Sequence, residues 1–431
     1  MNVREAAFLS LERCRSGDKF ANLELDSAIK KYGLDGTDRG FFTVLVYGVI
    51  ERKITLDHMI GSFSSIPVEK LDPKALTLLR LGTYQIMFLS RTPDSAAVNE
   101  SVELAKRYLN KGTAGFVNGV LRSIVRNKEA LPYPSREESP IDYLSVYYSI
   151  PQWLCRRWTE DYGFHKAERM LEAVNVNPPI TLRVNTLRTT RAELISILEE
   201  AGISATPTEL SENGVRLPHG VPVSDLQALK DGLCFVQDEA SQICVATLGA
   251  REGETVIDTC SCPGGKSFGA AMDMKNKGRL VSLDLHESKL SLVKSGAERL
   301  GIDIVEAAVH NGSSPREDLI GKADRVLSDV PCSGLGVIAK KPDLRYKSPD
   351  DIDRLPEVQK RILESSSKYV KTGGILVYST CTVNKRENED VVSAFLTAHP
   401  EFSLCEEGMR TFFPDTDRTD GFFVAKMKKT D

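Results

Sequence analysis

From about residue 233 onward, stretches typical of buried strands alternate with amphipathic helical stretches. The expected strands are Thr255–Asp258, Leu280–Leu285, Ile304–Val309, Arg325–Asp329 and Gly374–Thr380. One intervening helix is indicated by an apolar face made of Leu290, Val293, Ala297 and Leu300. Repeated strand–helix units predict a mostly parallel sheet covered by helices on both sides. Ligands of such sheets bind beyond the carboxyl ends of the strands, so we expect the functional residues directly after each strand.

The N-terminal part of the chain, residues 1–130, has a helical pattern throughout. Asp72-Pro73 is typical of an N-cap followed by proline at the first helical position. The apolar run from Phe41 to Ile50 is too short to cross a bilayer and predicts a buried helix. A further helical stripe, expected to end at Lys111-Gly112, is formed by Val98, Val102, Ala105 and Leu109.

A polar, proline-bearing stretch at residues 131–138 indicates a linker. Beyond it, short strands and helices mix, with a strand expected at Ile180–Val184 and a helix at Arg191–Ala201. The sequence therefore predicts a multidomain protein in three parts. These are an all-helical domain (1–130), a small α/β connector (131–232) and a C-terminal α/β domain with a Rossmann-like sheet (233–431).

Charge is distributed unevenly along a chain whose net charge is −4. Residues 1–130 hold 19 Lys+Arg against 15 Asp+Glu, and the rest holds 37 against 45. The positive excess suits contacts with phosphates, although ordinary surface variation explains it equally well. The first residues lack a basic-then-apolar leader, so we expect a cytoplasmic protein. Nine cysteines without CxxC spacing, and only six histidines, predict neither a disulfide framework nor a metal site.

A glycine-rich turn follows the first strand of the alternating half. Gly264 and Gly265 let the backbone approach a ligand closely, and the next helix offers free N–H groups. The turn is neither a dinucleotide G-x-G-x-x-G nor a Walker A loop, since Cys260 stands where the latter needs glycine. Asp284, at the end of the second strand, is placed either to accept hydrogen bonds from a ribose or to cap a helix. Together these signals favour an adenosine-containing cofactor.

Two cysteines come after neighbouring expected strands, Cys332 after Asp329-Val330-Pro331 and Cys381 after Thr380. A lone cysteine is usually an inert buried residue, but two at the functional edge of one sheet suggest reactive thiols. Methylation of cytosine at C5 is one reaction that requires such a thiol. A thiolate that adds to C6 of cytosine makes C5 nucleophilic enough to take a methyl group. An acidic group near N3 assists the addition.

Five segments resemble motifs of the RsmB/NOP family of RNA cytosine-C5 methyltransferases, most closely its bacterial 16S rRNA enzymes. They are DTCSCPGGKS (258–267), SLDLHESKL (282–290), DVPCSGLGVIAKKPDLRYK (329–347), YSTCTVNKRENE (378–389) and DGFF (420–423). The segment VQDEAS (236–241) matches a further family signature, and residues 114–122 resemble the end of a NusB-like antitermination domain. The resemblance covers nearly the whole chain. It implies S-adenosyl-L-methionine as cofactor, ribosomal RNA as partner, C5 methylation of a specific cytosine in 16S rRNA, and a monomer that binds neither membrane nor metal.

The resemblance also implies roles for individual residues. Cys381 is expected to be the nucleophile at C6, and Cys332 to assist product release. Asp329 is expected to contact the base near N3, and Lys266 to lie near the target. The expected cofactor-binding residues are Cys260, Ser261, Cys262, Pro263, Gly264, Gly265, Lys266, Asp284, Asn311 and Asp329.

Two positions depart from the family pattern. Ser261-Cys262 replaces the usual Ala-Ala, which backbone contacts tolerate, so we expect Cys262 to be structural. Asn311 stands where an aspartate is common; its amide accepts one hydrogen bond and donates others. In addition, the cations of the segment 340–347 are expected to hold RNA phosphates, with Tyr346 stacked on a base, unless the segment is a plain surface loop.

Other functions remain open at this point. One is the same chemistry on tRNA, and another is a non-catalytic RNA-binding assembly factor with the same fold. The second is disfavoured by intact Cys332, Cys381, Asp329 and Lys266. A nicotinamide-dependent oxidoreductase is disfavoured by the missing G-x-G-x-x-G.

Overall fold

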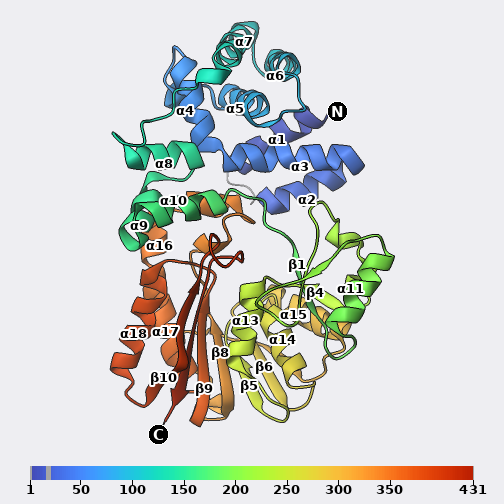
Figure 1. Ribbon diagram of the computed structural model, residues 1–431, viewed down its shortest axis with the longest axis vertical. Helices are drawn as coiled ribbons and strands as arrows, with labels where there is room; N and C mark the ends of the chain where they lie inside the picture. Colours follow the sequence, from blue (N-terminus) through green and yellow to red (C-terminus); the bar gives the residue numbers. More distant parts are fainter. Residues whose placement is uncertain (1, 16–20, 431) are drawn as a thin grey trace. The chain divides into compact units, whose positions relative to one another are not determined.

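The computed structural model describes residues 2–15 and 21–430 and divides the chain into two compact units (Figure 1). The helical unit consists of Met1–Val176 together with Lys340–Tyr346. The sheet unit consists of Asn177–Ala339 and Lys347–Asp431. A short segment from the C-terminal half of the sequence therefore belongs to the helical unit.

The regular elements described in the helical unit are all helices. They are α1 (Val3–Arg15), α2 (Ala21–Tyr32), α3 (Gly36–Glu51), α4 (Lys53–Phe63), η1 (Val68–Lys70), α5 (Pro73–Phe88), α6 (Asp94–Tyr108), α7 (Lys111–Arg126), η2 (Lys128–Ala130), α8 (Pro140–Tyr148), α9 (Gln152–Tyr162), α10 (Phe164–Ala173) and η6 (Pro342–Tyr346). The centre is α5, whose Leu78, Leu79 and Leu81 are buried in the main core. Asp72 caps this helix as predicted, since its carboxylate accepts from the N–H groups of Lys74 and Ala75.

Two further sequence predictions can be compared with these helices. The run 41–50 lies within α3, where Phe42, Leu45 and Val46 are buried, so the prediction of a buried helix is confirmed. The predicted helix end at Lys111-Gly112 is wrong, because Lys111 is the first residue of α7. The side chain of Asn110 accepts from the N–H of Thr113 at 2.9 Å and starts the new helix there.

The inserted segment 340–346 is held by the side chains of Arg345 and Tyr346. Arg345 is fully buried, and its Nη1 donates to the carbonyl oxygens of Glu51 (2.9 Å) and Ser149 (3.3 Å). The hydroxyl of Tyr346 donates to the carbonyl oxygen of Ile50 at 2.8 Å. The prediction that Arg345 binds RNA phosphates and Tyr346 stacks on a base is therefore wrong: both side chains satisfy carbonyl groups at helix ends within the unit.

The sheet unit begins with a small antiparallel sheet of order β2-β3-β1-β4. Its elements are β1 (Thr181–Val184), α11 (Arg191–Glu200), β2 (Thr206–Pro207), β3 (Gly214–Arg216), η3 (Val223–Asp225), α12 (Gln227–Lys230) and β4 (Cys234–Val236). Leu182 and Val184 of β1 pack against Leu194 and Leu198 of α11. The predicted strand and helix of this region are both confirmed.

The larger sheet has seven strands in the order β10-β11-β9-β8-β5-β6-β7. Its elements are α13 (Glu239–Leu248), β5 (Thr255–Asp258), α14 (Gly265–Asp273), β6 (Arg279–Asp284), α15 (Glu287–Leu300), β7 (Val305–Val309), η4 (Glu317–Leu319), β8 (Ala323–Asp329), η5 (Leu335–Val337), α16 (Pro349–Asp353), α17 (Leu355–Ser367), β9 (Val370–Thr380), η7 (Lys385–Glu387), α18 (Glu389–Ala398), β10 (Phe402–Phe412) and β11 (Phe422–Lys429). The five predicted strands are confirmed as β5 to β9. They run parallel, whereas β11 is antiparallel to β9, and β10 to β11.

Both faces of this sheet are covered. Val256 of β5 packs in the core that contains α13, α14 and α15, while its neighbour Ile257 packs in the core that contains α17 and α18. This alternation is the two-residue period of a strand buried on both sides. The chain order reverses between β5 and β8, so the carboxyl ends of these two strands lie at the position where parallel sheets bind ligands.

Candidate active site

Two thiols meet at the carboxyl ends of β8 and β9. Cys332 lies three residues beyond the end of β8, and Cys381 directly follows β9. The two strands pair in parallel with Asp329 opposite Ser379, which brings the following loops together. The Sγ atoms of Cys332 and Cys381 are 3.2 Å apart, a hydrogen-bonding distance for two thiols. The fold therefore joins two cysteines that are 49 residues apart in the sequence.

An ion pair lies at the same edge of the sheet. Lys266, near the start of α14, places its Nζ 2.7 Å from Oδ2 of Asp329. The other oxygen of Asp329 accepts from the hydroxyl of Ser379 at 2.8 Å. Nζ of Lys266 also lies 5.1 Å from the centre of the Phe422 ring, a cation–π contact. The charges of Lys266 and Asp329 are thus both held in fixed positions.

The pKa values of the two thiols are shifted in opposite directions. The hydrogen bond with Cys332 lowers the pKa of Cys381, and the positive charge of Lys266 also lowers it, against burial and Asp329. The same hydrogen bond raises the pKa of Cys332 well above the ordinary thiol value, as does burial. Burial by itself lowers the pKa of Lys266, but Asp329 and the nearby thiols raise it above its ordinary value. This arrangement favours a Cys381 thiolate next to a protonated Cys332 and a charged lysine.

The glycine-rich turn after β5 is compact. The N–H of Ser261 donates to the carbonyl oxygen of Leu283 at 2.9 Å, and that of Gly264 to Ser261 at 2.7 Å. Gly264 has a φ of +111°, and a Cβ there would lie 2.4 Å from the ring of Phe268. Glycine is therefore required at this position for two independent reasons.

Asp258, which ends β5, is buried below this turn. Its carboxylate accepts from the hydroxyl of Ser267 at 2.6 Å and from the N–H of Cys260 at 3.4 Å. Burial raises the pKa of Asp258 to about 7, although the Ser267 hydrogen bond opposes the rise. Asp258 thus stabilises the glycine-rich turn through hydrogen bonds from its buried side.

Asp284, at the end of β6, contacts the same turn. Its two carboxylate oxygens accept from the N–H groups of His286 (3.0 Å) and Cys262 (3.4 Å). The side chain is partly exposed, so it supports the helix start and still faces outward. On the next strand end, the exposed Asn311 accepts from the N–H of Ser313 at 3.1 Å, which leaves its amide N–H groups directed elsewhere.

The cysteine side chains of the turn pack into the two cores. Cys260 packs against the core beneath α17, and burial raises its pKa. Cys262 packs against the core on the opposite face, and burial together with Asp284 raises its pKa to about 12. These thiols are protonated, so the turn offers a ligand its backbone.

The structure adds three residues that sequence reasoning left without a role. Ser379 orients Asp329, as described above. Gln237 lies against the glycine turn, since a Cβ on Gly265 would be 3.4 Å from its Nε2, and its buried Oε1 has no hydrogen-bond partner. Glu387 is fully buried beside the thiol loops. Gln237 and Glu387 both lie in segments that match family motifs, and this match was the sequence feature that could have identified them.

Models of three protein families match successive parts of the chain. They are the NusB family (residues 1–126), the ferredoxin-like domain of RsmF/B-like methyltransferases (150–224) and the 16S rRNA methyltransferase RsmB/F family (245–428). Together they account for the helical N-terminus, the small sheet and the large sheet.

Full-length relatives agree with these matches. The chain is 40% identical to the probable ribosomal RNA small subunit methyltransferase B of Bacillus subtilis, over 99% of both chains. The chain belongs to the 16S rRNA methyltransferase RsmB/F family. It is also 34% identical to a protein of the same name from Synechocystis, over the full length of both, and 32% identical to the Escherichia coli K12 ribosomal RNA small subunit methyltransferase B, over 91% of both.

Solved structures share the fold of this RsmB/F family member. The crystal structure of PH0851 matches with a TM-score of 0.83 and 27% identity, covering 100% of this chain and 99% of that one. The structure of NSun6 from Pyrococcus horikoshii with SFG matches with a TM-score of 0.59 and 22% identity, over 65% of this chain and 98% of that one. The second likeness is one of fold alone.

The protein is a methyltransferase whose cofactor is S-adenosylmethionine. The residues at the strand ends fit this group: a glycine turn with free backbone, the outward-facing Asp284, and the unpartnered oxygen of Gln237. Within residues 2–15 and 21–430, no cluster of side chains suited to a metal ion is found. In the same part of the chain, no helix is long and apolar enough to cross a membrane.

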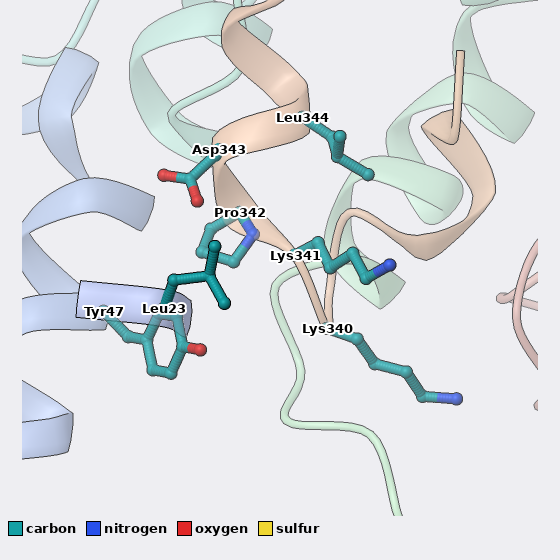
Figure 2. Close-up of a pocket in the computed structure, with 7 residues that line it drawn as sticks. All are labelled: Leu23, Tyr47, Lys340, Lys341, Pro342, Asp343 and Leu344. Atoms are coloured by element: carbon teal, nitrogen blue, oxygen red, sulfur yellow. The ribbon is translucent and has the colours of Figure 1, made fainter. Parts of the chain in front are cut away.

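The helical unit contains a cavity of about 250 Å³, and part of its lining comes from the inserted segment. It is lined by Leu23, Tyr47 and residues 340–344 (Figure 2). Figure 2 shows Lys340 and Lys341 extending to one side of the cavity, away from Leu23, Tyr47 and Asp343. Within the predicted RNA-binding segment, Lys341 is exposed and Lys340 is partly exposed.

Proposed function

We propose that the protein methylates C5 of a specific cytosine in 16S rRNA through a covalent bond between Cys381 and C6. The observation that carries the proposal is the pair of thiols 3.2 Å apart, beside the Lys266–Asp329 ion pair. One thiol of such a pair can be an anion while the other keeps its proton. S-adenosylmethionine supplies the methyl group when it is bound at the strand ends.

In the first step the Cys381 thiolate adds to C6 of the cytosine, and the electrons of the C5=C6 bond become available at C5. The ring nitrogen N3 takes up a proton in this step, while the adjacent amino group remains a hydrogen-bond donor. An ammonium and a carboxylate side by side match both requirements, which is the role we assign to Lys266 and Asp329.

After the methyl group has bonded to C5, N3 gives up the proton that it had taken up, and a base removes the proton of C5. Its loss re-forms the C5=C6 bond, and the bond between C6 and sulfur breaks, so that Cys381 leaves as a thiolate. We place Cys332 at this release step, because it is the group in contact with the sulfur of Cys381.

The cofactor is proposed to bind along Cys260, Ser261, Cys262, Pro263, Gly264, Gly265 and Lys266, with Asp284 at the ribose, Asn311 on the adenine side and Asp329 beside the reacting centre. We keep the division into RNA-binding residues 1–130, connector 131–232 and catalytic 233–431 as a functional proposal. The cytoplasmic location and the monomeric state remain predictions.

The test is bisulfite sequencing of 16S rRNA and tRNA after incubation with the purified protein and S-adenosylmethionine. We expect one protected cytosine in 16S rRNA and none in tRNA. Cys381→Ala should abolish methyl transfer while cofactor binding persists, and Cys405→Ala serves as the matched thiol control. Full turnover by Cys381→Ala would remove the assigned nucleophile, and modification of tRNA alone would redirect the substrate.

A further inference from the structure

The buried carboxylate of Glu387 is bonded to the loop that carries Cys332. Glu387 ends η7, and no part of it is exposed to solvent. One of its oxygens accepts from the backbone N–H of Ser333 (2.8 Å) and from the side-chain amide of Gln359 (2.9 Å). The other accepts from the side-chain amide of Asn384 at 2.9 Å. Ser333 directly follows Cys332, so Glu387 holds the backbone next to this thiol.

The same network reaches the loop of Cys381. The hydroxyl of Ser333 donates to Oγ1 of Thr382 at 2.9 Å, and the N–H of Asn384 donates to the same oxygen at 3.3 Å. Thr382 directly follows Cys381. A single carboxylate therefore connects the backbone segments that carry both thiols.

The three groups that donate to Glu387 are neutral. The side-chain oxygens of Asn384 and Gln359 are buried without a hydrogen-bond partner, so both amides present their N–H groups to the carboxylate. An ionised carboxylate only accepts hydrogen bonds and requires this orientation. The network therefore holds a negative charge inside the protein, where its effect on neighbouring groups is weakly screened.

The charges around the thiol pair are arranged asymmetrically. The groups that face the two thiols are Lys266 of α14, Asp329 at the end of β8, Tyr378 of β9, Asp420 before β11 and Glu387 of η7. The positive charge of Lys266 lowers the pKa of Cys381, whereas the negative charge of Glu387 raises the pKa of Cys332. Asp329 raises the pKa of both thiols, and Asp420 raises that of Cys381.

We propose that Glu387 is a positioning residue whose negative charge keeps the shared proton of the thiol pair on Cys332, which leaves Cys381 as the thiolate. The proton passes from one sulfur to the other, and no further reactant is needed. This inference rests on the proposed function in one respect, the assignment of Cys381 as the nucleophile.

The experiment is the substitution Glu387→Gln, which removes the charge and keeps the shape. The new amide oxygen still accepts from Ser333, and the unpartnered oxygens of Asn384 and Gln359 can turn to accept its N–H groups. The full chain without RNA is treated with iodoacetamide over a range of pH, and labelling of each cysteine is followed by peptide mass spectrometry. We expect the ratio of initial labelling rates, Cys381 over Cys332, to fall about tenfold, which corresponds to one pKa unit.

The matched control is Glu389→Gln, two residues along the chain, whose carboxylate accepts from the hydroxyl of Thr411 at 3.0 Å and lies outside the network. It should leave the labelling ratio unchanged. An unchanged ratio in Glu387→Gln, or equal slowing of both thiols, would overturn the proposal, because a merely structural role alters both alike. In methyl-transfer assays we expect kcat to fall while KM for S-adenosylmethionine stays constant.

A second variant covers the case in which Glu387→Gln does not fold. In Cys381→Ala, Cys332 has lost its thiol partner but keeps its burial and the charges of Glu387 and Asp329, so its labelling midpoint should remain above the ordinary thiol pKa of about 8.5. A midpoint at or below that value would contradict the inference. The labelling is done without RNA, so a midpoint at or below this value counts against Glu387 even if Cys381→Ala retains methyl transfer and the proposed function fails.

Discussion

At the scale of single residues, the chemistry of this site depends on which sulfur carries a proton. Cys332 and Cys381 are in contact, yet Lys266 acts on one and Glu387 on the other. Two identical side chains thus acquire different functions from their surroundings. Such asymmetry suits a reaction in which one thiol attacks and the other assists the departure of the product.

Removal of Cys332 should therefore stop the reaction after methyl transfer. In Cys332→Ala we expect a covalent protein–RNA adduct to accumulate, because Cys381 still adds to C6 but its release is impaired. After incubation with 16S rRNA and S-adenosylmethionine, the adduct is detected as a slowly migrating band in denaturing gel electrophoresis. The band must disappear in the double variant with Cys381→Ala; a band that persists there, or no band in the single variant, contradicts these roles.

The raised pKa of Asp258 predicts that the stability of the fold depends on pH. Burial raises its pKa to about 7 from an ordinary 3.8, so between these values the folded state holds a proton that the unfolded state has lost. The contribution of Asp258 to the free energy of unfolding is therefore present below about pH 4 and is lost as the pH rises to 7. The total change is on the order of 4 kcal/mol.

Asp258→Asn should remove this dependence, since the amide oxygen still accepts from Ser267 and no proton is exchanged. The measurement is denaturant unfolding of the cofactor-free chain at several pH values. Unfolding is monitored by chemical labelling of Cys244, which is fully buried in the folded chain. The exposed Asp231→Asn is the control. If the difference between Asp258→Asn and the unmodified chain is constant across this pH range, the assignment is incorrect.

At the scale of helices and strands, the sequence predicted what is local. Strands β5, β6, β8 and β9 were predicted because a strand buried on both faces leaves an apolar run in the sequence itself. The helix boundary at Lys111 was missed because Asn110 acts as a cap, a detail that the apolar stripe does not report. The candidate site residues were predicted from motifs, whereas their contacts required the fold.

Arg345 shows why the rest could not be predicted. A basic segment is usually solvated, and only the tertiary structure reveals that Arg345 bonds to Glu51, 294 residues away in the sequence. Glu51 ends α3, and Ser149 follows α8, so one guanidinium serves the carboxyl ends of two helices. Such ends carry unpaired carbonyls and favour a positive charge. Glu387 is a similar case, because its partners come from three separate segments.

Arg345→Met should destabilise the helical unit, because it keeps much of the volume but leaves buried carbonyl groups without donors. We expect a loss of about 2–3 kcal/mol. Both tryptophans of the chain, Trp153 and Trp158, lie in α9, so their fluorescence during denaturant unfolding reports on this unit. Lys341→Met, at an exposed position, is the control. Equal midpoints for the two variants would show that the buried contacts contribute little.

At the scale of the whole molecule, substrate binding has to be separated from chemistry. The helical unit includes α8 to α10 and residues 340–346, so a cut near residue 130 would divide this unit rather than remove it whole. Surface substitutions in the full chain avoid this problem. One face of α7 is suited to them, because Lys111, Arg122 and Arg126 are exposed along it and lie on either side of the exposed Gly115 and Gly119.

We predict that replacing Lys111, Arg122 and Arg126 with Ala weakens binding of 16S rRNA and leaves the affinity for S-adenosylmethionine unchanged. If all three contact phosphates, the slope of log K against log salt concentration should become shallower by about 2–3, since each contact releases close to one counterion. The control removes three exposed or partly exposed lysines at the opposite strand ends of the sheet unit, Lys275, Lys277 and Lys371. Equal salt slopes for the two triple variants would show that the protein binds its RNA through another surface.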